Sequence, residues 1–222
     1  MKRGFLLLVA IAANAAAQSP TDTTGSLVDR AARQYRAAKS VRAAFEQTLS
    51  APATGGVHPS HGDYVQSGSK FALRFTDPAG DAIVSDGKTL WLYLPSSAKG
   101  QVLKMPSQAG AGLDILTQLL AAPKDTYSSA RVGDETVDGR ATTVYTLSPK
   151  KKDFPFTRAK LWIGKSDALI WQLETVEESG LNRKVRFTSV QTDVDLSPDA
   201  FVFNVPAGVR VIDSNSLLGK KP

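Results

Sequence analysis

Apolar side chains recur at two different periods along this chain, and the period separates an expected helix from the expected strands. In the first segment they are spaced by three or four residues: Leu27, Ala31, Tyr35, Ala38, Val41, Phe45 and Leu49. This spacing predicts an amphipathic helix of about six turns. Ser26 is a suitable N-cap, and Pro52 followed by Gly55 and Gly56 predicts the end of the helix.

The period changes to two after a loop that carries His58 and His61. In residues 70–76, KFALRFT, the large side chains of Phe71, Leu73 and Phe75 lie at every second position, which predicts a strand. A turn follows at residues 77–80. Residues 82–85 and 89–94 then flank an Asp-Gly dipeptide, and this arrangement predicts a β-hairpin.

The rest of the chain predicts further strands and one short helix. Residues 113–121 carry few polar side chains, so this helix must lie against an apolar surface. The other expected strands are residues 101–105, 142–147, 159–163, 169–176, 184–191, 201–203 and 209–212. Together these elements predict an α+β, mostly β fold with a single curved antiparallel sheet and helices on one face or in its mouth.

The N-terminus has the pattern of a secretory signal peptide. Lys2 and Arg3 precede an apolar run at residues 5–13 and an Ala-rich segment that ends near Ala17. We therefore expect residues 1–17 to be a signal peptide, 18–213 a single domain and 214–222 a disordered tail. A soluble exported protein is the expected product, and the absence of cysteine means that a core of apolar side chains must stabilise it.

The inventory of reactive side chains argues against catalysis. The chain has no cysteine and only two histidines, His58 and His61, too few for a structural zinc site of three or four ligands. The adjacent acid pairs lie where solvated strand ends are expected, so a hydrolase acting on envelope polymers is the weaker alternative. We expect no enzyme activity, no metal and no cofactor.

A formal net charge of +6 is spread along the chain without a recognisable nucleic-acid-binding module. We therefore expect no nucleic-acid partner. The chain has more apolar side chains than a half-open barrel with a movable apolar helix needs to fill its core. A lipid-binding site therefore follows as a hypothesis.

Several segments together resemble the LolA family, the periplasmic carriers of outer-membrane lipoproteins. The matching segments are FEQT at residues 45–48, Gly62-Asp63, Lys70-Phe71, IVSDGKTLWLYLP at 83–95 and VPAGVRVID at 205–213. The resemblance implies that the single curved antiparallel sheet forms an incomplete β-barrel with helices covering its concave apolar face. It also implies a periplasmic carrier that takes acyl chains of outer-membrane lipoproteins from an inner-membrane ABC release complex and passes them to an outer-membrane receptor of the LolB type. A monomer is expected. The alternative is a general lipid-binding or envelope-sensing module on the same half-barrel.

The expected lipid-binding side chains are apolar: Phe71, Leu73, Phe75, Trp91, Tyr93, Leu113, Leu116, Leu119, Trp171 and Phe187. Sequence leaves open whether Trp91 and Tyr93 or their leucine neighbours face inward. Family members often carry an arginine shortly before the Lys-Phe pair that hydrogen-bonds to the lid helices, but this chain has Ser67 there. We therefore expect weaker lid contacts or a different lock, with Arg74 as one candidate.

Overall fold

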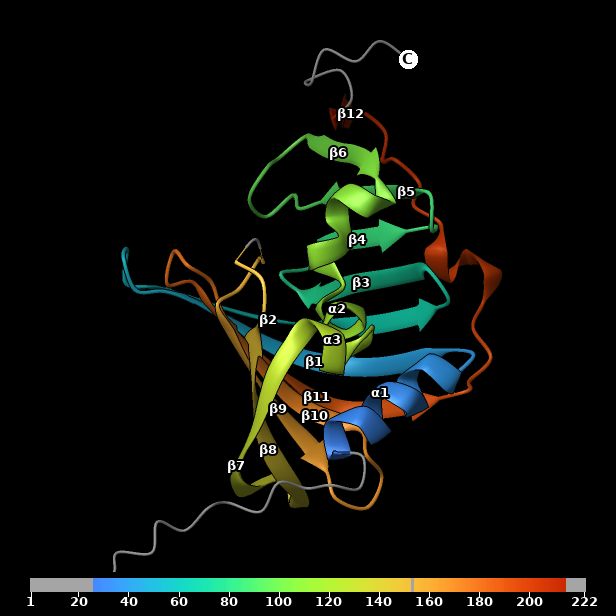
Figure 1. Ribbon diagram of the computed structural model, residues 1–222. Coiled ribbons are helices and arrows are strands. Elements are labelled where there is room, and N and C mark those ends of the chain that lie inside the picture. The colour runs from blue at the N-terminus through green and yellow to red at the C-terminus, as the bar shows by residue number, and fades with distance from the viewer. Residues whose placement is uncertain (1–25, 153, 215–222) are drawn as a thin grey trace, which may run out of the picture.

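A computed structural model of the protein describes residues 26–152 and 154–214 (Figure 1). The expected signal peptide and all but the first residue of the expected tail lie outside the described residues. One open sheet of twelve strands organises the rest, in the order β12-β6-β5-β4-β3-β2-β1-β11-β10-β9-β8-β7. Figure 1 shows this sheet curving around the helices, so the prediction of a mostly β fold with an incomplete barrel is confirmed.

The strands differ widely in length, and the longest lie at the centre of the sheet and at its β7–β8 edge. Every pair of neighbours is antiparallel except β12 and β6, which pair in parallel. Their bounds are β1 Val41–Ala51, β2 Gly56–Ser67, β3 Lys70–Asp77, β4 Ala82–Ser85, β5 Thr89–Tyr93, β6 Gln101–Pro106, β7 Tyr127–Val137, β8 Arg140–Pro149, β9 Arg158–Gly164, β10 Ile170–Val176, β11 Asn182–Thr192 and β12 Arg210–Asp213.

The first helix is much shorter than predicted. Helix α1 spans Leu27–Ala37, with Ser26 capping it by accepting the N–H of Asp29, and the chain then becomes the central strand β1. The prediction failed because Val41, Phe45 and Leu49 are spaced by four residues. An interval of four keeps side chains on one face of a helix and, being even, also on one face of a strand.

Three other predictions of secondary structure were wrong. The segment with both histidines is strand β2 and not a loop, and the polar strand β7 was not predicted at all. Residues 201–203 form no strand, because the chain makes a short 3-10 helix, η2, at Pro198–Phe201 and then continues without regular structure. The short apolar helix expected at residues 113–121 is present as α2 Ile115–Leu120, and it is flanked by two short helices that were not predicted, η1 Ser107–Leu113 and α3 Pro123–Thr126.

The predicted hairpin is confirmed, although its turn is shifted by one residue. The N–H of Asp86 donates to the carbonyl of Thr89, which leaves Gly87 and Lys88 at the two central positions. Gly87 has a φ of +90°, a backbone conformation that glycine adopts without strain. The Asp86 carboxylate accepts the N–H groups of Lys88 and Thr89 and so closes the turn.

The two faces of the curved sheet bury separate sets of side chains. The concave face carries the main core, in which α1, α2 and the strands contribute buried residues such as Val28, Phe45, Leu90, Leu119 and Leu161. The convex face carries two small clusters, one around Val84 and Phe201 and one around Trp162 and Trp171. The position of a side chain in the alternation along its strand therefore decides whether it packs on the concave or the convex face.

Gly62 on β2 lies at a close approach of three strands, and a side chain there should destabilise the fold. A Cβ at Gly62 would lie 2.4 Å from the carbonyl oxygen of Arg74 and 3.0 Å from atoms of Phe45 and Phe75. We predict that Gly62→Ala lowers the free energy of unfolding by roughly 1–3 kcal/mol, measured as the urea midpoint. Gly133→Ala on β7, where the space is open, is the control. Equal midpoints for the two variants would contradict the prediction.

Candidate functional site

The concave face of the sheet contains a hollow of about 690 Å³. This volume lies within the range of roughly 300–1,000 Å³ that is usual for small-molecule sites. The hollow is formed over strands β1 to β5, and η1 closes one side of it. Its apolar lining consists of Leu49, Leu73, Phe75, Ile83, Leu92, Leu94 and Leu113.

Most polar groups of the hollow are already held by the protein. The amide of Gln47 donates to the hydroxyl of Ser60 over 3.1 Å. The carboxylate of Asp81 accepts the backbone N–H and the hydroxyl of Ser96, at 3.0 and 2.6 Å. The hollow therefore offers mainly aliphatic and aromatic surface to a ligand, together with the guanidinium of Arg183, which also lines it.

A smaller void of about 30 Å³ adjoins the hollow beneath α2. The void and the hollow share the side chains of Leu73, Leu113 and Arg183. On its far side the void is bounded by Leu116 and Phe187. Removal of α2 would therefore join the two spaces into one larger apolar surface.

The segment η1–α2–α3, residues 107–126, lies over the concave face and will be called the lid (Figure 1). Its apolar side is carried by Leu116, Leu119 and Leu120, which are all buried. Burial of a leucine side chain is worth about 1.5–3 kcal/mol, so these three residues account for most of the attraction between the lid and the sheet.

Polar contacts fix both ends of α2. At its C-terminus, Arg36 of α1 donates to the carbonyls of Leu120 and Ala121 over 3.0 and 3.2 Å. These carbonyls lie at the C-terminal end of the helix, where carbonyl groups have no hydrogen-bond partner within the helix. Lys124 of α3 also forms an ion pair with Asp29 of α1 over 3.1 Å. Helix α1 is thus the element to which the end of the lid is attached.

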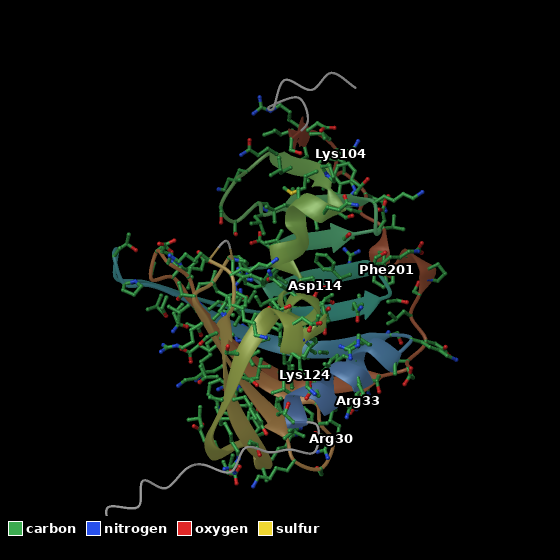
Figure 2. The ribbon with its side chains drawn as sticks, viewed as in Figure 1. Arg30, Arg33, Lys104, Asp114, Lys124 and Phe201 are labelled. Carbon is green, nitrogen blue, oxygen red and sulfur yellow. The ribbon has the colours of Figure 1, made fainter. Side chains whose placement is uncertain are left out.

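At the N-terminus of α2, the cap Asp114 accepts the N–H of Thr117 and the hydroxyl of Tyr64, the latter over 2.9 Å (Figure 2). Asp114 is buried, and this burial raises the pKa of its carboxyl above the ordinary value, although the hydrogen bonds from Thr117 and Tyr64 oppose the shift. Burial raises the pKa of the Tyr64 hydroxyl as well, so it remains a donor. An ionised Asp114 therefore opposes closure of the lid.

Neither residue considered for the family arginine's role contacts the lid. Ser67 donates its hydroxyl to the carbonyl of Lys39 over 2.9 Å. Arg74 points to the convex face, where it donates to the carbonyls of Ala200 and Val202. Arg36 makes the arginine contact instead, and it comes from α1 rather than from the sheet.

Seven of the ten expected site residues lie on the concave side. Leu73, Phe75 and Leu113 line the hollow, and Leu116 and Phe187 line the void. Phe71 and Leu119 are buried in the same core, with exposed fractions of 5% and 0%. These seven side chains form one continuous apolar region with the lid.

The three remaining residues lie on the convex face, which corrects their expected place. Trp91 and Tyr93 both contact Phe203, with ring centroids 5.6 Å apart in each case. Trp171 lies in the convex cluster, and Arg140 stacks on its ring at 3.9 Å. Their leucine and isoleucine neighbours on β5 and β10 face inward because successive side chains of a strand alternate between faces.

Sequence reasoning missed Leu49, Ile83, Leu92, Leu94 and Arg183 of the hollow. Leu90, Leu92 and Leu94 lie on one face of this strand, but Trp91 and Tyr93 make its other face apolar as well, so alternation alone could not select the leucines. Arg183 carried no signal, since an arginine next to Lys184 has the pattern of a solvated strand end.

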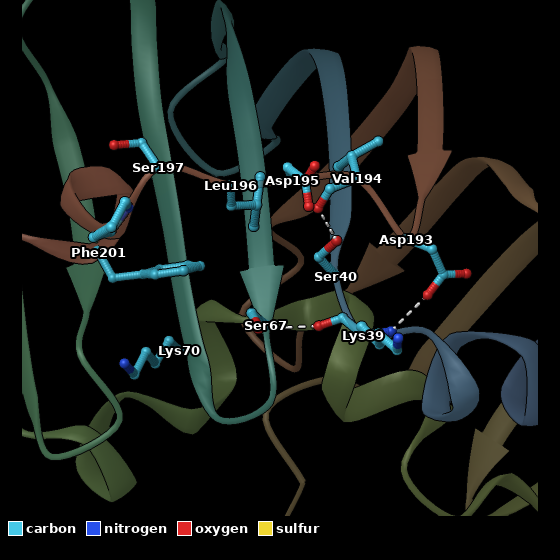
Figure 3. A pocket seen from close by; sticks show the side chains of 11 residues that line it. Lys39, Ser40, Ser67, Lys70, Asp193, Val194, Asp195, Leu196, Ser197 and Phe201 are labelled. Atoms are coloured by element: carbon cyan, nitrogen blue, oxygen red, sulfur yellow. Dashed lines mark hydrogen bonds between the residues drawn. The ribbon is translucent and has the colours of Figure 1, made fainter.

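A second groove, of about 520 Å³, lies on the convex side next to the start of β1 (Figure 3). Its walls are joined by hydrogen bonds. Ser40 donates to the carbonyl of Val194, and the Lys39 N–H donates to Asp193. The lining has two lysines, two aspartates and three serines beside four apolar residues, so it suits acyl chains less well than the concave hollow does.

Among the described residues no helix is long and apolar enough to cross a membrane. The same residues contain no group of three or more His, Cys, Asp and Glu side chains that could hold a metal ion. His58 and His61 are exposed on β2, and His61 lies 3.7 Å from the carboxylate of Asp77.

Comparisons with known proteins agree with this architecture. A protein named outer-membrane lipoprotein carrier protein from Methylibium petroleiphilum is 29% identical over 215 residues, 96% of this chain and 99% of that protein. One of the same name from Chromobacterium violaceum is 26% identical over 215 residues, 97% and 100% of the two chains. The crystal structure of an uncharacterised conserved protein from Thermus thermophilus has a TM-score of 0.54 at 12% identity, covering 84% of this chain and 96% of that one, which shows a likeness of fold alone.

A family model described as outer membrane lipoprotein carrier protein LolA matches residues 36–204, more than half of the chain. This match covers the sheet from β1 to β11 together with the lid, so the elements that form the hollow all lie within it. The chain therefore belongs to the LolA family of outer membrane lipoprotein carrier proteins.

Proposed function

We propose that this protein is a periplasmic carrier that shields the acyl chains of lipoproteins between an inner-membrane ABC release complex and an outer-membrane receptor of the LolB type. The observation that carries the proposal is the hollow of about 690 Å³ on the concave face, with aliphatic and aromatic walls and a lid over its inner end. Membership of the LolA family supports the same role.

The apolar surface of the hollow suits the physical task of such a carrier. A methylene group gains about 0.8 kcal/mol by leaving water, so acyl chains do not leave a membrane unless another apolar surface receives them. Leu73, Ile83 and Leu92 stand opposite one another on β3, β4 and β5 and offer such a surface. The carrier role needs only binding and release, and none of its steps requires a catalytic group or a cofactor.

Release requires that the bound state be reversible, and the lid supports this. Its helix α2 has only six residues, and few polar contacts hold it: those at its two ends and one from the hydroxyl of Tyr127 to the carbonyl of Gln118. A helix this short is not stable alone in water. The lid can therefore be displaced as a unit when acyl chains compete for the surface under Leu116 and Leu119.

Mass spectrometry of the mature protein purified from its own periplasm tests the role directly. Triacylated lipoproteins bound one to one are the expected finding. Free fatty acid or phospholipid without lipoprotein would favour a general lipid-binding module instead. An empty protein that cleaves an envelope polymer would contradict the proposal.

A substitution that fills the hollow should reduce binding without unfolding the protein. Leu92→Trp places a larger side chain in the hollow, and we expect at least about tenfold weaker binding of a fluorescent triacylated peptide, since several methylene contacts are lost. Tyr93→Leu, one residue later but on the convex face, should leave the affinity unchanged. Equal affinities of the two variants would place the acyl chains elsewhere.

Loss of the Arg36 contact should open the lid. Arg36→Ala removes two hydrogen bonds to the end of α2, and because Arg36 is solvent-exposed we expect a loss of about 1 kcal/mol, or roughly fivefold faster hydrogen exchange of the α2 amides. Arg33→Ala, which changes an exposed arginine one turn earlier on α1 (Figure 2), is the matched control. If α2 exchanges equally fast in both variants, Arg36 is not the lock.

The buried carboxyl of Asp114 should make closure depend on pH. Its pKa is raised by burial, so the folded state favours the protonated form, and this contribution to stability is present at low pH and is lost as pH rises from the ordinary value of 3.8 through the raised value. Asp114→Asn retains a cap but cannot ionise. The urea midpoint of the variant relative to the native protein should rise between pH 4 and pH 7. A constant difference would contradict the assignment.

A further inference from the structure

Among the described residues, Arg183 is the one charged residue that lines both the hollow and the void, and its position is unusual for an arginine. It stands on β11 opposite Leu49 of β1 and Thr175 of β10. It has the same parity as Val185 and Phe187, which are buried in the concave core. The side chain is therefore directed into the apolar side of the sheet, where it is partly buried.

The guanidinium of Arg183 makes no hydrogen bond or ion pair with any residue that the structure describes. Glu177, in the turn before β11, attracts it electrostatically but is not an ion-pair partner. The burial lowers its pKa, yet an arginine remains charged in proteins. Other arginines on the sheet do find partners, as Arg186 does with Glu46 and Asp138 on the convex face.

The surroundings do not neutralise this charge either. The carboxylate of Asp81, which also lines the hollow, is occupied by two donors of Ser96. The amide of Gln47, also shared by the two spaces, donates to Ser60. A guanidinium offers five N–H donors in a planar fork that fits a carboxylate or phosphate. A partly desolvated cation without a protein partner is unfavourable, and an anion that enters with an apolar chain would relieve this cost.

We propose that Arg183 is an anion subsite of the hollow, which binds the carboxylate or phosphate head of an anionic acyl lipid while the chain lies over the apolar walls. The tri-acylated end of a lipoprotein carries ester and amide carbonyls and no anionic group, so this ligand class goes beyond the proposed lipoprotein cargo. A lipid of one chain fits beside the lid without displacing it, because Arg183 lines the larger hollow as well as the void.

Displacement of a fluorescent acyl probe from the native protein tests the subsite. The competitors share one chain and differ in the head group: oleate, oleoyl lysophosphatidic acid and the neutral oleyl alcohol. We expect both anions to compete at least about tenfold better than the alcohol, as one charge-assisted bidentate contact allows. Inorganic phosphate up to millimolar concentration should not displace the probe, because it lacks the chain.

Arg183→Gln should abolish the preference for the anions while leaving the affinity for oleyl alcohol unchanged, which also shows that the variant is folded. Arg183→Lys should retain part of the preference. Lys184→Gln removes the same charge from the next residue, which is exposed on the other face of β11, and should retain all of it.

Equal competition by the anions and the alcohol in the native protein would overturn the proposal. An equal loss of the preference for anions in the Lys184 and Arg183 variants would also overturn it. Whichever anion competes better identifies the head group as a carboxylate or a phosphate. If the native protein shows no preference for anions, the proposed lipoprotein binding is unaffected. If the native protein does not bind the neutral oleyl alcohol at all, that result counts against the carrier role itself.

Discussion

An open sheet with an apolar concave face must have that face covered, and this constraint governs the rest of the structure. A closed barrel would satisfy its edge strands and fill its interior with side chains. Here the sheet stays open between β12 and β7, and helices cover the concave face instead. The cover has two parts. Helix α1 has eleven residues, five of them buried, whereas the lid is a segment of short helices with three buried leucines.

Some strands, such as β5, are apolar on both sides, and their convex side must be covered as well as their concave side. Trp91, Tyr93 and Trp171 are large enough to build a core, but Phe203, Arg140 and small local clusters cover them instead. The chain after β11 crosses this face as η2 and its flanking segment, and Phe201 packs there against Ala72 and Val84. The convex aromatic residues therefore stabilise the hairpin β4–β5 from outside and leave its leucines free to line the hollow.

Sequence alone predicted most strands and the class of the fold, because alternation over short segments such as residues 70–76 is unambiguous. It failed where two periods coincide, as at Val41, Phe45 and Leu49, and where a strand is polar or rich in Gly, Pro and His, as in β2 and β7. In the site, alternation placed Leu73 and Phe75 correctly. It could not choose the parity of β5, since both of its faces are apolar, and it gave no sign of Arg183 because burial of a charge depends on long-range packing of β1 and β10 around it.

The contacts of the lid indicate how acyl chains could take its place on the concave face in the proposed carrier. Displacing α2 exposes Leu116, Leu119 and Leu120, at about 1.5–3 kcal/mol for each side chain. At about 0.8 kcal/mol for each methylene, two to four buried methylenes offset one leucine, so in the proposed carrier the acyl chains that enter beneath α2 offset the exposure of its leucines. The polar contacts of Arg36 and Tyr64 then decide the balance. They are lost on opening and are not replaced by an apolar ligand, which in the proposed carrier keeps the closed state favoured until acyl chains arrive.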